Sequence, residues 1–265
     1  MSNTANIAEL FKTAEEEGSL SPVSAHTLKI VDVGNQIKAA LGVKVDDIKA
    51  SEVTLVTMLI DDSGSIRFAL NTEIVRDGHN LVLDALSESK QENSILAHTR
   101  YLNGKILFPY CPVGQAIRMD EHNYNPNLGT PLYDESVVAL GTVLAKTQEF
   151  SDNGVVVRSV TLIVSDGADE HSRRATAKSV ADIVRDMLKS EIHIVAAMGI
   201  DDGGRTDFRQ IFKEMGIRDE WILTPSNTKS EMRKAFQLFS KSAVRASQSA
   251  RVFSQLALGG GFANP

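Results

Sequence analysis

The chain has 265 residues and a formal net charge of −6, with 42% hydrophobic and 23% charged residues. This length and composition are typical of one large globular domain, alone or with an accessory segment. The acidic balance argues against nucleic acid as the main partner, because phosphate binding depends on clustered Lys and Arg. Cys111 is the only cysteine, so a disulfide within the chain is excluded.

The start of the chain is polar and acidic over residues 1–11, which is not the pattern of a secretory signal. No apolar run approaches the roughly 20 residues that a membrane-spanning helix needs. We therefore expect a cytoplasmic protein whose partners include no membrane.

Residues 1–50 are predicted to form a separate helical extension. An amphipathic helix over residues 5–17 ends at Gly18, a residue suited to a helix C-terminus. A second helix is expected over residues 21–42, although Gly34 inside it lowers the helix propensity.

From residue 53 onward, strand and helix patterns alternate. The unbroken apolar run over residues 53–60 is typical of a strand that is buried on both faces. Apolar residues at helical spacing follow over 66–85. Two β-rich runs, 95–101 and 105–110, flank an Asn-Gly dipeptide, which is a strong hairpin signal.

The second half of the chain continues the alternation. The remaining predicted elements are helices over 132–150, 175–188, 208–215 and 229–252, and strands over 155–164, 192–198 and 221–223. Alternating strands and helices indicate an α/β fold, in which a mostly parallel sheet has helices on both faces. The hairpin adds one antiparallel edge strand to that sheet.

Three oxygen-bearing side chains follow the first predicted strand, namely Asp61, Ser63 and Ser65. On a loop that leaves a strand, side chains at this spacing can converge on one point. One carboxylate and two hydroxyls are hard oxygen ligands, and no Cys or His accompanies them. This set suits Mg²⁺ or Mn²⁺ rather than Zn²⁺.

Two later segments add oxygen atoms at equivalent places. Thr130 precedes the helix over 132–150, where it is the predicted N-cap, with Pro131 in the first turn. Asp166 follows the strand over 155–164. Open α/β sheets bind ligands beyond the carboxyl ends of their strands, where the strand order reverses. If this strand neighbours the first one, Asp61 and Asp166 meet there.

The motifs Asp-x-Ser-x-Ser, Gly-Thr-Pro-Leu-Tyr and Ser-Asp-Gly, in this order, resemble the metal-ion-dependent adhesion site of von Willebrand factor type A domains. The resemblance implies a Rossmann-like, three-layer α/β fold. It also implies that Ser63, Ser65 and Thr130 ligate a cation, with Asp61 and Asp166 bonding to it directly or through water.

The resemblance further implies a function in binding rather than catalysis. Mg²⁺ prefers six oxygen ligands, and this set supplies at most five side chains, so a partner protein's Asp or Glu would complete the shell. Some intracellular family members serve AAA-type ATPases, which makes such a system a possible partner. The glycines of the three motifs are expected to border the partner, at Gly64, Gly129 and Gly167.

The predicted domain organisation is a helical extension over 1–50, a von Willebrand A domain over 51–245, and the end of the last helix with a flexible Gly-rich tail over 246–265. One departure from the family concerns residues 66–70. In the integrin branch, acidic residues at this place build a second metal site, but Ile-Arg-Phe-Ala-Leu has none, so a second metal is not expected.

An enzyme is the alternative function. Magnesium-dependent phosphatases of the haloacid-dehalogenase type carry a resembling Asp-x-Asp after the first strand, as part of phosphoryl-transfer or hydrolase chemistry. Here Ser63 stands where the second carboxylate is needed. The nucleophile elbow Gly-x-Ser-x-Gly is also incomplete around Ser63. We therefore expect no enzymatic activity.

Several residues have simpler interpretations that stay open. Asp61 and Asp166, together with Ser63 and Ser65, could instead cap helices and turns. Asp62 is expected to face solvent. His171 could reach the rim of the site but is expected to be a surface residue, and His193 a half-buried residue with a satisfied ring. A basic stretch near the C-terminus is either a solvated helix face or a docking surface for an acidic partner: Lys229, Arg233, Lys234, Lys241, Arg245 and Arg251.

Overall fold

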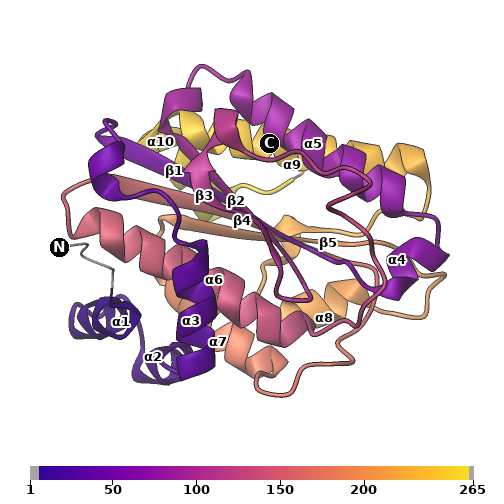
Figure 1. Ribbon diagram of the computed structural model, residues 1–265, viewed down its shortest axis with the longest axis horizontal. Coiled ribbons are helices and arrows are strands. Elements are labelled where there is room, and N and C mark those ends of the chain that lie inside the picture. The colour runs from indigo at the N-terminus through magenta and orange to yellow at the C-terminus, as the bar shows by residue number, and fades with distance from the viewer. Residues whose placement is uncertain (1–5, 263–265) are drawn as a thin grey trace.

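The computed structural model describes residues 6–262 and shows a central sheet between layers of helices (Figure 1). The sheet has six strands in the order β3-β2-β1-β4-β5-β6. All neighbouring strands pair in parallel except β2 and β3, which form the antiparallel hairpin. This confirms the predicted α/β class. The strands are β1 (Glu52–Ile60), β2 (Ile95–Tyr101), β3 (Ile106–Pro112), β4 (Val156–Ser165), β5 (His193–Gly199) and β6 (Ile222–Leu223).

The strand order reverses between β1 and β4, which lie side by side at the centre of the sheet. Their register pairs Ile60 with Val164, so the two strands end level with each other. Nearly every residue of both strands is buried, as the apolar runs predicted. The residues that follow β1 and β4 are therefore brought to one place, as expected.

Helices cover both faces of the sheet. Figure 1 shows α5 and α9 over one face and α6 with α7 over the other. No helix within residues 6–262 is long and apolar enough to cross a membrane. The helices are α1 (Ile7–Glu16), α2 (Pro22–Leu28), α3 (Val31–Ala40), α4 (Gly64–Phe68), α5 (Thr72–Ser87), α6 (Leu132–Ser151), α7 (Ala177–Lys189), α8 (Phe208–Glu214), α9 (Lys229–Gln248) and α10 (Ala250–Gly259).

The first 50 residues are helical as predicted, but the second helix is divided. The break falls at Ile30, whose extended backbone (φ −60°, ψ 130°) precedes α3, and not at Gly34. Gly18 takes a positive φ of 77° just after α1, in agreement with its predicted role as helix terminator. The predicted start of the first helix at Ala5 lies outside the described residues.

These N-terminal helices pack against α6 rather than standing apart. Phe11, Leu28 and Ile37 are fully buried and belong to the same hydrophobic core as α6. A Cβ placed on Gly141 of α6 would lie 2.6 Å from Leu28 and 2.7 Å from Ile37. Glycine is therefore required where these helices approach α6 most closely.

Two other predicted helices are also divided. The pattern over 66–85 is interrupted at Leu70, whose φ is +60°, between α4 and α5. The last helix breaks at Ser249, whose backbone is extended and whose hydroxyl accepts a hydrogen bond from Val252 N to begin α10. A serine that caps a new helix was read in the sequence as an interior helix position.

The predicted flexible tail is folded as far as the structure describes it. Phe253 and Leu256 of α10 are buried, and Phe262 packs edge-on against Trp221 with ring centroids 5.1 Å apart. Apolar residues flank the glycines and fill the core up to Phe262, and the flexibility of the tail stays a prediction. Residues 263–265 lie outside the described part of the chain.

Candidate metal centre

Three chain segments meet beyond the carboxyl ends of β1 and β4. The first carries Asp61, Ser63 and Ser65 from β1 into α4, which lies at this end of the sheet (Figure 1). The second carries Asp166 out of β4. The third passes through Leu128, which forms an isolated parallel bridge with Ser63. The sequence separates these segments widely, and the reversal of strand order joins them.

Two hydroxyls and one carboxylate converge at the centre of these loops. The Ser63 and Ser65 Oγ atoms are 2.8 Å apart. Ser65 donates a hydrogen bond to Asp166 Oδ1 at 2.6 Å, and Ser63 Oγ lies 3.4 Å from the same oxygen. Asp166 and Ser63 are buried, whereas Ser65 is exposed, so the cluster opens to solvent on one side.

Asp61 lies behind this cluster and joins the two loops. Its Oδ1 accepts a hydrogen bond from Ser63 N at 2.8 Å, and its Oδ2 accepts one from Ser165 Oγ at 2.7 Å and one from Asp166 N at 3.3 Å. The Asp61 carbonyl also accepts a hydrogen bond from the Tyr124 hydroxyl at 2.6 Å. Both carboxylate oxygens of this fully buried residue are therefore occupied.

Burial raises the pKa of both aspartates. It raises the pKa of Asp166 to about 7, and the negative charge of Asp61 acts in the same direction. Burial also raises the pKa of Asp61, and this effect outweighs the hydrogen bonds from Ser63 and Ser165, which lower the pKa. A cation at this place would favour the ionised form of both carboxyl groups.

Thr130 reaches the same region through the third segment. A Cβ added to Gly167, next to Asp166, would lie 3.8 Å from the Thr130 Oγ1. No hydrogen bond of this hydroxyl occurs within the part of the chain that the structure describes, although the residue is only 5% exposed. The structure thus brings Asp61, Ser63, Ser65 and Asp166 into contact and places Thr130 beside them.

The predicted role of Thr130 as N-cap of α6 is wrong. Pro131 occupies the N-cap position, and no side chain of that residue or of Thr130 caps the helix. Ser172 does so instead, because its Oγ accepts hydrogen bonds from Tyr133 N at 3.1 Å and Asp134 N at 2.9 Å. Because a residue of the loop after β4 caps the helix, the Thr130 hydroxyl does not cap it.

The loop after β4 is held against α6 by backbone donors. The Asp134 carboxylate accepts hydrogen bonds from the backbone N–H groups of Arg173, Arg174 and Ala175 at 2.7–3.0 Å. His171 Nδ1 accepts one from Thr130 N at 3.0 Å. His171 is exposed, as expected of a surface histidine, and it also reaches the rim of the site.

The three motif glycines have different surroundings. A Cβ on Gly129 would lie 2.7 Å from the His171 ring, so the close approach of that ring requires glycine. A Cβ on Gly64 would meet the Phe68 ring at an ordinary 3.4 Å, and Gly167 has more space. A role of Gly64, Gly129 and Gly167 in partner binding stays a prediction.

Asp62 does not face solvent, contrary to the sequence prediction. It is 4% exposed, and its Oδ1 accepts a hydrogen bond from Asn103 N in the turn of the β2–β3 hairpin at 3.1 Å. Its carbonyl accepts hydrogen bonds from Asn127 N and Leu128 N. Burial raises the pKa of Asp62 to about 7. Asp62 thus joins three loops without belonging to the hydroxyl cluster.

His193 is fully buried rather than half-buried, and its ring is satisfied as predicted. Its Nδ1 lies 2.7 Å from Ser159 Oγ on the neighbouring strand β4. Burial lowers the pKa of His193 to about 4. The ring is therefore neutral and structural, at the opposite end of the strands from the metal loops.

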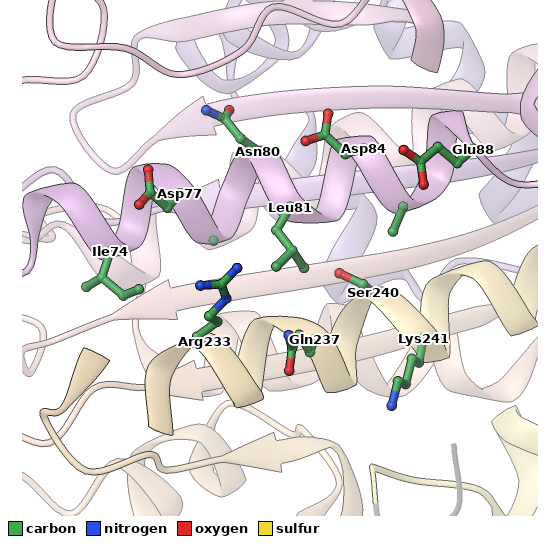
Figure 2. A pocket seen from close by; sticks show the side chains of 12 residues that line it. Ile74, Asp77, Asn80, Leu81, Asp84, Glu88, Arg233, Gln237, Ser240 and Lys241 are labelled. Atoms are coloured by element: carbon green, nitrogen blue, oxygen red, sulfur yellow. The ribbon is translucent and has the colours of Figure 1, made fainter. Parts of the chain in front are cut away.

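Three residues of the basic stretch, Lys229, Arg233 and Lys241, lie on α9 beside acidic residues of α5. A cavity of 670 Å³ lies between the two helices, with Asp77 and Asp84 on its α5 wall and Arg233 and Lys241 on its α9 wall (Figure 2). At one end Lys229 forms an ion pair with Glu73, with 2.7 Å between nitrogen and oxygen. This neighbouring negative charge favours the interpretation as a solvated helix face.

The donor set at the loops after β1 and β4 fits a hard divalent cation. Within residues 6–262, no group of three or more His, Cys, Asp or Glu side chains could hold a metal ion. The cluster instead combines serine and threonine hydroxyls with buried carboxylates, which are oxygen donors of the kind that Mg²⁺ and Mn²⁺ prefer.

Several supporting residues were not predicted from the sequence. Ser165 fixes Asp61, Tyr124 binds its carbonyl, and Ser172 and Asp134 tie the loop after β4 to α6. Ser165 stands next to Asp166 in the Ser-Asp-Gly motif, and this position could have identified it as a supporting residue. The other three act across long sequence separations and have no local pattern.

No protein-family model matches the sequence, and no curated protein matches it. Solved structures are similar in fold. The pilus adhesin SpaC from Lactobacillus rhamnosus GG superposes with a TM-score of 0.54 at 14% identity, covering 74% of this chain and 30% of that one. Proximal thread matrix protein 1 from the mussel byssus gives a TM-score of 0.51 at 12% identity, covering 73% of this chain and 46% of that one.

The chain thus spans less than half the length of each of these two structures. At such identities the likeness concerns the fold alone. These two structures are von Willebrand A domain proteins, and the strand order and layers described above agree with them. The chain therefore has the von Willebrand factor type A fold, as its motifs predicted.

Proposed function

We propose that this domain binds one divalent cation, Mg²⁺ or Mn²⁺, and uses it to hold an acidic side chain of a partner protein. The observation that carries the proposal is the convergence of Ser63, Ser65 and Asp166 on one point that is open to solvent through Ser65. Ser63, Ser65, Thr130 and Asp166 would hold the cation. Asp61, whose oxygens are already bonded, would orient Ser63 and Asp166 from behind.

The cation supplies a positive charge and open coordination positions to which a carboxylate can bind. Hydroxyl ligands carry no charge, so they leave part of the cation's charge unbalanced. A partner's Asp or Glu both completes the ligand shell and balances this charge. No feature of the site favours an AAA-type ATPase over other proteins with an accessible Asp or Glu. We propose a cytoplasmic setting, because with Cys111 alone the chain needs no oxidising compartment to fold.

Catalysis of phosphoryl transfer is the alternative, and the burial of Asp61 argues against it. A phosphatase of the kind considered above needs its first aspartate free to attack phosphorus. Asp61 is 0% exposed, and each of its carboxylate oxygens accepts a hydrogen bond. Ser63 also stands where the acid/base carboxylate is needed.

Calorimetric titration with Mn²⁺ tests the proposal. We expect one site per chain in the wild type and none in the double variant Asp61→Ala/Ser63→Ala. The Asp47→Ala variant is a matched control, since Asp47 lies in the 3₁₀ turn over Val45–Asp47, before β1 and away from the metal loops. Equal Mn²⁺ binding by the double variant and the wild type would rule the metal site out.

A further inference from the structure

Three large apolar side chains that are exposed in the structure border the loops of the metal centre. Phe68 is 77% exposed at the end of α4, Leu70 is 83% exposed two residues later, and Leu128 is 50% exposed on the third segment. Single exposed apolar residues are common on protein surfaces. Here, however, Phe68 and Leu128 both lie beside one small site, and Leu70 follows Phe68 by two residues along the chain. A clustered apolar surface marks contact with a partner.

Contacts around Gly64 show how near two of these residues are to the hydroxyl cluster. The Phe68 ring passes 3.4 Å from the position that a Cβ of Gly64 would take. Leu128 O accepts a hydrogen bond from Gly64 N at 2.9 Å. Gly64 lies between Ser63 and Ser65 in the chain, so Phe68 and Leu128 approach the same short segment that carries the two serine hydroxyls.

The geometry of the segment after α4 points the same way. Arg67 lies over the Phe68 ring, 5.2 Å from its centroid, and places a positive charge beside this ring. Leu70 has a φ of +60°, a conformation that is unfavourable for a residue with a Cβ. Since its side chain is exposed, packing within the chain does not explain a leucine at this strained position.

We propose that Phe68, Leu70 and Leu128 form an apolar rim that selects the partner. The rim contacts an aliphatic or aromatic side chain next to the Asp or Glu that reaches the cation. This inference rests on the proposed function and adds the chemistry of the residues that flank the acidic one. The positive charge of Arg67 disfavours a basic residue at the same place.

A peptide library tests the rim without knowledge of the natural partner. Short peptides carry Glu at the centre and random residues around it, and they are selected on the full chain in Mg²⁺ and in chelator. We expect the peptides that bind only in Mg²⁺ to be enriched in Leu, Ile, Phe or Met beside the Glu. Magnesium-dependent selection for Glu with no apolar enrichment would overturn the rim.

Surface variants test whether Phe68, Leu70 and Leu128 cause the preference for apolar residues beside the Glu. We expect Phe68→Ser/Leu128→Ser to weaken binding of an enriched peptide roughly tenfold or more, since burial of an apolar side chain is lost, while Mn²⁺ binding stays at the wild-type level. Leu70→Asn, which suits a positive φ, should weaken it to a smaller degree. The control Val156→Ser, an exposed residue at the opposite end of β4, should have no effect.

The outcomes separate this inference from the proposed function. If the double variant binds the enriched peptide as tightly as the wild type does, the rim is wrong and the metal site stands. If the wild type binds no Mn²⁺ and selects no Glu peptide, the proposed function fails, and the rim fails with it.

Discussion

Ser65 Oγ donates a hydrogen bond to Asp166 Oδ1 across 2.6 Å, although 101 residues separate the two along the chain. The contact joins the loop after β1 to the loop after β4. Protein hydrogen bonds therefore gather the candidate ligands in advance, which lowers the entropic cost of binding a cation.

The stability of the Asp166→Asn variant should not depend on Mg²⁺. In chelator we expect a melting temperature equal to or above that of the wild type, since the variant removes the repulsion between two buried carboxyl groups and still accepts from Ser65. In Mg²⁺ at about 100 times its Kd, the wild type should gain roughly 2.7 kcal/mol and the variant nothing. Thermal melts in both buffers measure this, and an equal Mg²⁺ shift in both proteins would contradict it.

Thr130→Ala and Ser172→Ala form a matched pair. Thr130 does not cap α6, so its variant should melt like the wild type in chelator and lose metal-dependent binding of a Glu peptide. Ser172 caps Tyr133 N and Asp134 N, so its variant should lose about 1 kcal/mol of stability. A lower melting temperature with intact peptide binding in Thr130→Ala would show that Thr130 is not a ligand.

Asp62→Ala should reduce stability without removing the metal site. The variant removes the hydrogen bond from Asn103 N, which belongs to an exposed residue, at a net cost of roughly 0.5–1.5 kcal/mol. Asp62→Asn keeps an acceptor oxygen and serves as the control with near-normal stability. Urea denaturation and Mn²⁺ calorimetry on both variants give the comparison. Loss of Mn²⁺ binding in Asp62→Asn would mean that Asp62 belongs to the ligand set.

His193 should make stability depend on pH in a predictable direction. Burial lowers its pKa from 6.5 to about 4 in the folded state. Between these values the unfolded chain binds the proton and the folded chain does not, so acidification destabilises the fold. Between pH 7 and pH 5 the free energy of unfolding of the wild type, relative to His193→Gln, should fall by roughly 2 kcal/mol. A pH-independent difference between the two would refute the assignment.

The wild-type protein should not hydrolyse phosphate monoesters in the presence of Mg²⁺. Asp61 is buried with both oxygens bonded, and no carboxylate stands at Ser63. A panel of generic phosphatase substrates provides the measurement. Turnover that disappears in Asp61→Asn would instead favour the enzyme.

The strands and the metal loops were predictable because their signals are local. The buried run over Glu52–Ile60 and the Asn-Gly turn of the hairpin each show in a few consecutive residues. The rule for open sheets predicted that Asp61 and Asp166 meet if β1 and β4 are neighbours, and it left that adjacency open. The resemblance of the three motifs to a metal-ion-dependent adhesion site implied that both aspartates lie at one cation.

The errors come from contacts between distant segments. Asp62 looks like a solvent-facing residue in the sequence, and only the hairpin turn at Asn103 explains its burial. Ser172 caps a helix that begins 40 residues earlier at Leu132, so Thr130 was assigned that role by proximity alone. The breaks at Ile30 and Leu70 depend on the backbone angles of single residues, extended at Ile30 and φ +60° at Leu70, which residue propensities do not encode.

The approach of α3 to α6 has a consequence for work with shortened chains. A fragment that starts at residue 51 would uncover the apolar stripe around Gly141 that Leu28 and Ile37 now cover. It would also remove Gln36, which accepts a hydrogen bond from the buried Arg100, itself paired with Glu135 in the first turn of α6. If such a fragment no longer bound a partner, the cause would be damage to α6, whose start adjoins Thr130. The loss would say nothing about which side chains bind the cation.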